Sequence, residues 1–237
     1  YSQDLEEVRG LAGAMHRELE KLIPSFVKRA GPSEYLAAVE RSARTLAGEI
    51  VTEAPAATDD PVRLVDWDEG AEEKILAAIL YPHARHPLPQ IRAMVAKLPP
   101  ERREKILEEH LGRRRNRRDK PGRAFEQVYY TFDVLGNLGL YRDLHRHRIL
   151  TQERQAFTTE HGYDTPPEIA EAGFKPQFDA CMERAAALHD RIRRDLPAEA
   201  QYVVPFAYRV RWSVKLNLRE AVHIGELRSM PQGHPDY

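Results

Sequence analysis

The chain has 237 residues, of which 42% are hydrophobic and 31% are charged, a balance that predicts a globular protein with a substantial core. A formal net charge of −1 excludes a global field that would attract nucleic acid or an anionic membrane, so anion recognition must come from local clusters. No apolar run approaches the ~18 residues that span a bilayer, and the single cysteine excludes an internal disulfide, so we expect a cytoplasmic protein without nucleic-acid or membrane partners.

Two amphipathic helices are predicted before a linker. Apolar residues at three-and-four spacing predict a helix over residues 4–27, with Asp4 and Glu7 as a capping box and Pro24 as its kink or end. A second helix is predicted over residues 34–51. The stretch TEAPAATDDP, residues 52–61, is small, polar and proline-bearing. We therefore expect a helical extension over residues 1–51, a linker over 52–61 and a main domain over 62–237.

The first half of the main domain alternates strands with helices. The stretch VRLVDW, residues 62–67, is a strand candidate, and helices are predicted over 69–80, 89–98 and 100–111, with Gly112 ending the last of them. Apolar and polar residues then alternate with period two over residues 125–134, which predicts a half-buried strand. A helix is expected from about Asn137.

The second half of the main domain has the same mixed character. Residues 167–196 are predicted to be mostly helical, with a break at AGFKP, and to bury Cys181 as a structural thiol. Strict alternation over residues 208–216 predicts the clearest strand, and a last helix is expected over 217–228. The predicted fold class is therefore α+β, helix-rich, with a small and mostly antiparallel sheet.

Two local clusters of charged or histidine residues are candidates for a functional site. The stretch LGRRRNRRDKPGR, residues 111–123, is either a solvated loop or a phosphate-facing loop of a ligand site, and its lack of interleaved aromatics argues against nucleic-acid stacking. His83 and His86 lie three residues apart, but prolines bracket them and no third ligand completes a zinc set nearby. We therefore predict no metal.

The triplet Arg146, His147 and Arg148 closes the helix expected from Asn137. Consecutive helical residues point about 100° apart, so these side chains share a ligand only if the helix ends there. A second cluster, Asn217, Arg219 and Arg228, lies on the last helix, where residues eleven apart fall near one stripe. By itself the triplet is either a solvated surface run or part of an anion site. Two arginine-rich helix ends, each beside an alternating strand, suit a ligand with several phosphates or an extended dinucleotide.

At these positions the chain resembles the flavin-dependent thymidylate synthases. The family carries an Arg-His-Arg triplet, an upstream Thr-Phe strand and a downstream Asn-x-Arg with a Leu-Arg pair on one helix. Co-linear matches lie in PGRAFEQVYYTFDV, in the triplet and in AQYVVPFAYRVRWSVKLNLREAVHIGELR. The matching positions include Glu126, Thr131, Phe132, Pro205, Asn217, Arg219, Leu227 and Arg228.

The resemblance implies a thymidylate-synthase-complementing-type fold, assembled as a homotetramer with active sites at subunit interfaces. It implies binding of FAD and of deoxyuridine monophosphate (dUMP), with methylene-tetrahydrofolate and NADPH as co-substrates for reductive methylation. By position, the cofactor-binding residues would be Arg146, His147, Arg148, Glu126, Asn217, Arg219 and His223. Glu153 and Arg228 would contact the nucleotide substrate, with Arg228 as the catalytic residue, because a fixed cation can stabilise negative charge on the pyrimidine.

Several nucleotide-side positions depart from the family pattern. Gln155 and Phe157 stand where the family has a serine and an arginine, and Gln201 stands in place of another arginine. Asp143 replaces a glutamine, and its carboxylate would repel a phosphate. The alternative interpretation is therefore a catalytically degenerate partner domain that keeps flavin or nucleotide binding. Residues 15–30 also resemble the family's closing helix, which suggests a second copy within a tandem-domain protein or else a homo-oligomer.

Overall fold

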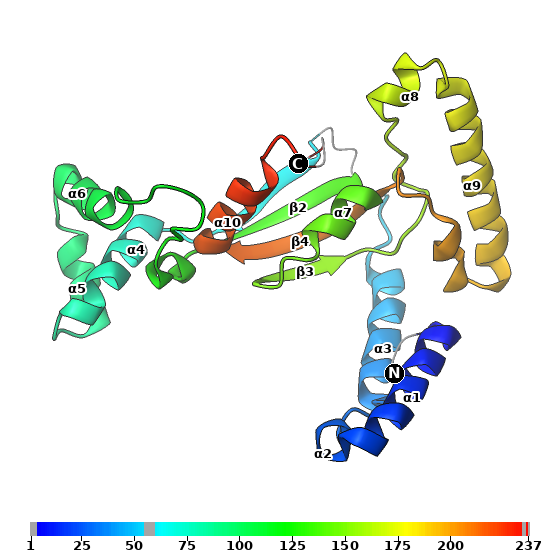
Figure 1. Ribbon diagram of the computed structural model, residues 1–237, viewed down its shortest axis with the longest axis horizontal. Coiled ribbons are helices and arrows are strands. Elements are labelled where there is room, and N and C mark those ends of the chain that lie inside the picture. The colour runs from blue at the N-terminus through cyan, green and yellow to red at the C-terminus, as the bar shows by residue number, and fades with distance from the viewer. Residues whose placement is uncertain (1–3, 55–59, 234–235, 237) are drawn as a thin grey trace. The chain divides into compact units, whose positions relative to one another are not determined.

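The computed structural model describes residues 4–54, 60–233 and 236 (Figure 1). The chain folds as two compact units, which are taken separately below. One unit comprises residues 1–59 with 187–203, and the other comprises residues 60–186 with 204–237.

Helices make up the first unit. They are α1 (Glu6–Leu22), α2 (Pro24–Val27) and α3 (Glu34–Ile50), with residues 187–195 of α9 (Lys175–Asp195) and a short 3-10 turn, η3 (Glu199–Val203). As predicted, α1 ends just before Pro24, which instead begins α2 because a missing amide hydrogen costs nothing in a first helical turn.

The predicted capping box of α1 is wrong. Leu5 occupies the N-cap and no side chain caps the helix. Asp4 instead lies 2.7 Å from the guanidinium of Arg44 on α3, and a carboxylate held there is not available to cap α1. Residues 52–54 and 60 of the predicted linker are neither helix nor strand, whereas 55–59 fall outside the described residues. The domain boundary stays a prediction.

The second unit is built on a four-stranded sheet. Its strands in the described chain are β1 (Val62–Trp67), β2 (Tyr129–Asn137), β3 (Leu150–Arg154) and β4 (Arg209–Asn217), in the order β1-β2-β4-β3. All three pairings are antiparallel. The α+β class with a small antiparallel sheet is thus confirmed.

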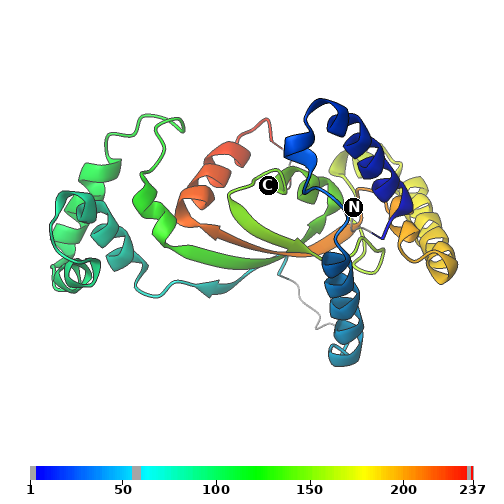
Figure 2. The same cartoon turned by 90° about the horizontal axis from the view of Figure 1, so that it is seen from below.

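The alternation predicted for β4 separates an apolar face from a polar one. Val210, Trp212 and Leu216 are buried, whereas Ser213 and Lys215 point to the opposite face and are exposed. Helix α7 (Leu138–Leu144) packs on the apolar face, where Leu140 joins Val210 and Trp212 in one cluster. Helix α10 (Leu218–Arg228) continues directly from β4 and lies to one side of the sheet in Figure 2.

A small helical lobe precedes β2. It contains α4 (Ala71–Leu80), the turn η1 (Tyr81–His83), α5 (Leu88–Val95) and α6 (Pro100–Leu111), the last capped by Gly112 as expected. Leu76, Ala77, Ile91 and Val95 form its core. The strand predicted from residue 125 begins later, because residues 123–127 form the 3-10 turn η2 (Arg123–Gln127), which buries Phe125 beside Ile75.

Three further findings complete the comparison with the sequence-based expectations. The break at AGFKP is confirmed by α8 (Pro167–Glu171) and α9 (Lys175–Asp195). The predicted burial of Cys181 is wrong, because the neighbouring Met182 occupies the inward position and leaves the thiol exposed. No helix in the described residues combines the length and apolar character needed to cross a bilayer.

Candidate functional site

The start of α10 is fixed by the side chain of Asn217. Its Oδ1 accepts a hydrogen bond from the backbone N–H of Glu220 at 2.9 Å, which satisfies one of the unpaired donors of the first turn. Asn217 is also the last residue of β4, and it is buried. The cap therefore sets the direction in which Arg219, Glu220 and His223 leave the sheet.

The Arg-His-Arg triplet lies just beyond α7, which ends at Leu144. The backbone N–H of His147 donates to the carbonyl of Leu144 at 3.1 Å, which turns the chain and separates the three side chains. His147 points inward and is only 8% exposed, whereas Arg146 and Arg148 are exposed. Arg146 lies 3.7 Å from the Asp143 carboxylate. The triplet thus presents one buried imidazole and two solvent-facing cations.

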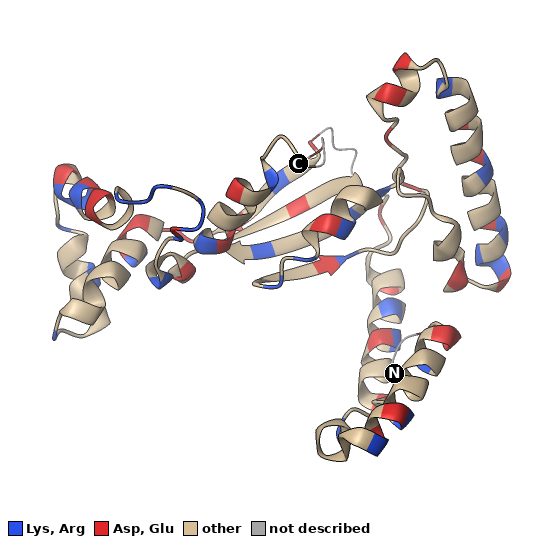
Figure 3. Cartoon of the chain, viewed as in Figure 1, with Lys and Arg blue, Asp and Glu red and all other residues tan. Residues whose placement is uncertain are grey.

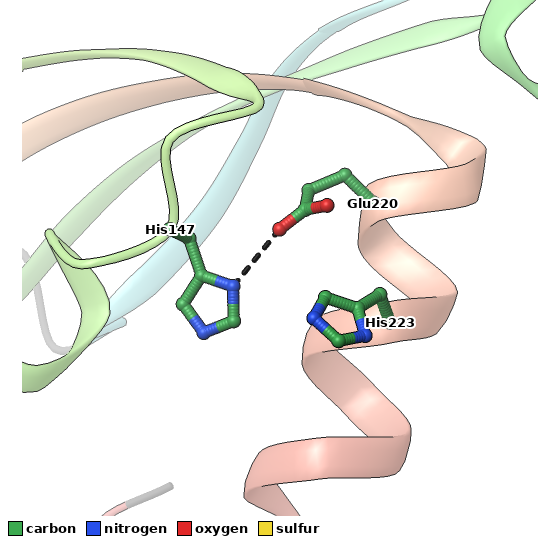
Figure 4. Close-up of side chains that lie close together, drawn as sticks. All are labelled: His147, Glu220 and His223. Carbon is green, nitrogen blue, oxygen red and sulfur yellow. Dashed lines mark hydrogen bonds and ion pairs between the residues drawn. The ribbon is translucent and has the colours of Figure 1, made fainter. Parts of the chain in front are cut away.

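His147 contacts α10 through both ring nitrogens. Nδ1 lies 2.9 Å from Oε1 of Glu220, as Figure 4 shows, and Nε2 accepts a hydrogen bond from Nε of Arg228 at 3.1 Å. A second guanidinium nitrogen, Nη2 of Arg228, donates to the carbonyl of Asp143 at 2.9 Å. The ring of His223 packs edge-on against that of His147, with centroids 5.6 Å apart. The triplet and α10 therefore form one connected cluster.

The same cluster contains the donor types of a metal site. Ligand atoms of His147, Glu220 and His223 all lie within 4.8 Å of one another, a combination that other proteins use for divalent ions. His83 and His86 are exposed and do not belong to this group. The absence of a metal stays a prediction.

The arginine loop, residues 113–120, and the segment that follows it are each attached to α10. Nη2 of Arg114 donates to both carboxylate oxygens of Glu226, at 2.7 and 2.9 Å. Arg219 on α10 donates to the carbonyl of Pro121 and to Oε1 of Glu126, each at 2.8 Å. Figure 3 shows the concentration of basic residues in this loop. Most of its side chains are exposed, as the solvated-loop interpretation expects. The phosphate-facing interpretation stays a prediction, although Arg117 and Lys120 of the loop border a hollow.

That hollow has a volume of about 330 Å³ and lies between the arginine loop, η2 and the first turns of α10. Four of the predicted cofactor-binding residues line it, namely Glu126, Asn217, Arg219 and His223. The remaining lining residues are Arg117, Lys120, Pro121, Arg123, Ile149, Glu220, Val222 and Glu226. We call it the α10 pocket. Arg117 and Lys120 form no ion pair with a carboxylate among the described residues, so both can meet a bound anion.

Two larger hollows lie in the helical lobe. One of about 690 Å³ is bordered by Leu98 and by apolar and charged residues of α4 and α6, and it contains none of the predicted site residues. The other, of about 640 Å³, shares Arg123 and Glu126 with the α10 pocket. Size alone would favour the first, but the charged and hydrogen-bonding groups converge on the α10 pocket, which is the stronger site candidate.

The two predicted substrate contacts, like the Arg-His-Arg triplet, lie apart from the pocket lining. Arg228 donates hydrogen bonds to His147 and to the Asp143 carbonyl, and Glu153 lies on β3 opposite Ser213. Opposite residues in an antiparallel pair share a face, so Glu153 points to the polar face of the sheet, away from Trp212 and α7. Glu220 was not predicted as a site residue. The Asn-x-x-Glu spacing after β4, typical of a helix start, could have indicated it.

Comparison with known proteins agrees with this geometry. Residues 63–237 match the model of the family described as thymidylate synthase complementing protein. The chain belongs to this family. The match extends over β1 to α10 and therefore contains every residue of the α10 pocket.

Similar proteins within the curated set carry the name UPF0159 protein. The chain is 38% identical over 242 residues to those of Chlamydia pneumoniae and Chlamydia muridarum, covering 99% of this chain and 46% of each relative. It is 39% identical over 184 residues to the UPF0159 protein of Thermoplasma acidophilum, covering 75% of this chain and 36% of that relative. The chain therefore spans less than half the length of these relatives.

Proposed function

We propose that the protein is an FAD-dependent thymidylate synthase-like enzyme that methylates dUMP, or a related pyrimidine nucleotide, with methylene-tetrahydrofolate and NADPH. The main support is the α10 pocket, where Glu126, Asn217, Arg219 and His223 come together from separate segments of a family member. When bound, FAD would supply the hydride chemistry, and the chain would supply binding, orientation and charge.

The residues of the α10 pocket fit part of FAD. Arg117 and Lys120 offer cations for the pyrophosphate, and His223 offers an aromatic ring and a ring N–H. About 330 Å³ lies at the small end of the range for ligand pockets, so the pocket holds only a portion of a dinucleotide. The remainder would be bound from outside it, in agreement with the interface sites that the family resemblance implies.

For Arg228 we propose contact with the nucleotide. Its guanidinium donates hydrogen bonds to His147 Nε2 and to the Asp143 carbonyl, which fix the direction of the group. A preoriented cation can stabilise negative charge as it develops on a pyrimidine ring. Arg146 and Arg148 are exposed beside this group and would contact phosphates. Glu153 is kept as a proposed substrate contact.

A degenerate partner domain is the second candidate, and one observation favours it. Phe157, which stands where the family resemblance expects an arginine, packs between two apolar clusters and under the guanidinium of Arg154, 3.8 Å from its ring centroid. Gln155 accepts a hydrogen bond from His161 at 3.3 Å. Neither side chain offers a nucleotide phosphate the grip that an arginine provides.

The deciding experiment begins with the absorbance spectrum of the purified protein after incubation with FAD. Retained flavin absorbance supports the proposal, and an FAD-indifferent protein contradicts it. The second step measures release of the C5 proton of dUMP in the presence of NADPH and methylene-tetrahydrofolate. Flavin binding without proton release would favour the degenerate partner. The same assays with the full-length gene product would test the proposed tandem or homo-oligomeric assembly, and cell fractionation would test the proposed cytoplasmic location.

A further inference from the structure

The protonation of His147 follows from its two partners. A guanidinium has donors only, so Nε2 of His147 must accept the hydrogen bond from Nε of Arg228 through its lone pair. The ring hydrogen therefore sits on Nδ1, 2.9 Å from Oε1 of Glu220, and is donated to that carboxylate. The two contacts together select the neutral Nδ1–H tautomer.

Burial makes this arrangement rigid. The side chains of His147 and Glu220 are 5% and 9% exposed, and a buried carboxylate is costly unless it is hydrogen-bonded. Glu220 is the third residue of α10, and its backbone N–H is bound by the Asn217 cap. A glutamate at this position commonly turns back to the N-cap backbone, whereas here its carboxylate reaches across to His147.

We propose that Glu220 is a positioning residue, which acts through His147 to hold the guanidinium of Arg228 in its ligand-binding orientation. Glu220 fixes the tautomer and the ring plane, and Nε2 of His147 then offers Arg228 an acceptor in one direction. The Asp143 carbonyl accepts a hydrogen bond from Nη2 of Arg228 and supports the same orientation. The ligand contact of Arg228 rests on the proposed function, whereas the relay itself rests on hydrogen bonds within the chain.

A divalent metal on His147, Glu220 and His223 is the competing use of these side chains. Ligation through Nδ1 of His147 would displace the hydrogen given to Glu220. The ring would then carry its hydrogen on Nε2, facing a guanidinium that can only donate. Arg228 would also bring a fixed positive charge against the ion. The observed contacts therefore favour the relay over a metal site.

The relay can be tested by nitrogen NMR on protein labelled with ¹⁵N at histidine and arginine. We expect the Nδ1–H tautomer for His147 and a coupling through the hydrogen bond between Nε of Arg228 and Nε2 of His147. Glu220→Ala should abolish that coupling. Glu220→Gln should retain it, because an amide oxygen still accepts from Nδ1–H. Glu226→Gln is the matched control, since this carboxylate lies on the same helix and binds Arg114 instead.

Three spectroscopic outcomes would overturn the proposal. They are an Nε2–H tautomer in the wild-type protein, a coupling that persists in Glu220→Ala, and added Zn²⁺ that displaces the His147 ring hydrogen while Arg228 loses its coupling. The wild-type tautomer is decisive even if Glu220→Ala does not fold.

A second experiment measures the binding of dUMP to the FAD-loaded protein by calorimetry. Glu220→Ala should weaken binding about tenfold, as expected for one misdirected charged hydrogen bond, and Glu220→Gln should remain within about twofold. Unchanged dUMP binding in a variant that has lost the coupling would contradict the positioning role. If wild-type protein shows the relay but binds no dUMP, the proposed function fails while the relay stands.

Discussion

Asn137 and Asn217 stand at opposite ends of one pair of strands and perform the same task. In the antiparallel pairing of β2 with β4, Asn137 lies opposite Arg209 and Asn217 lies opposite Tyr129. Each side chain then caps the helix that follows its strand, accepting from the N–H three residues ahead at 2.8 and 2.9 Å. The two helices that carry the site, α7 and α10, are therefore each started by the end of a central strand.

Removing the second cap should destabilise the fold. We expect Asn217→Ala to lower the free energy of unfolding by about 1 kcal/mol, because a buried N–H at the start of α10 loses its acceptor. Urea denaturation measures the change. Asn116→Ala is the control, since Asn116 makes a comparable bond to Arg118 in an exposed loop and should alter stability by less than about 0.5 kcal/mol.

The attachment of the arginine loop to α10 predicts a change in protease sensitivity. Arg219→Ala removes the bonds to Pro121 and Glu126 and should increase trypsin cleavage within residues 113–120 severalfold, since local opening exposes the loop. Mass spectrometry of the first cleavage products gives the rate. Arg209→Ala removes an arginine paired with Asp164 away from the loop, and an equal increase in this control would argue against a local tether.

Arg228 should matter more for ligand binding than for folding. Arg228→Ala is expected to weaken dUMP binding at least about tenfold, while the loss of the hydrogen bonds to His147 and Asp143 lowers the free energy of unfolding by only about 1–2 kcal/mol. Calorimetry and urea denaturation give the two values. The exposed Arg113→Ala should change neither. A stability loss well above 3 kcal/mol without a binding defect would make Arg228 a structural residue.

The hydrogen bonds of the Asp68 carboxylate predict that the protein loses stability in acid. Hydrogen bonds from Lys74 and from the backbone N–H of Tyr129 lower the pKa of this carboxyl below its ordinary value. A lowered folded-state pKa gives stability that is present above the unfolded pKa, about 3.9, and is lost as the pH falls through the folded one. Urea denaturation from pH 6 down to pH 2 should show this loss, with a shallower slope in Asp68→Asn. Equal slopes would contradict it.

The sequence was sufficient to predict the strands whose side chains alternate. In β4 the buried Trp212 and the exposed Ser213 follow each other with period two, and the pattern is readable without the partner strands. β3 was not predicted, because LTQER has polar residues at both odd and even positions and so shows no alternation. The segment forms a strand by pairing with β4. Strand formation there depends on a tertiary partner that local propensity does not encode.

The site was partly predictable for the same reason. Residue type and spacing brought Asn217, Arg219 and His223 together, since Asn217 caps the short helix that carries the other two. The role of Glu220 depends on His147, 73 residues earlier in the chain, and no local pattern reports that distance. Burial of Cys181 was mispredicted because α9 is amphipathic and the choice between adjacent positions 181 and 182 depends on which face meets Tyr208.

The lining of the α10 pocket has a consequence for the speed of binding. Four arginine or lysine side chains stand there beside three glutamates, and Arg219 is already paired with Glu126. An approaching phosphate would meet a nearly balanced field at long range and would gain attraction only at close range, where it meets Arg117 and Lys120. Association should therefore be slow for an anionic ligand and nearly insensitive to ionic strength, with dissociation rates carrying most of the difference between ligands.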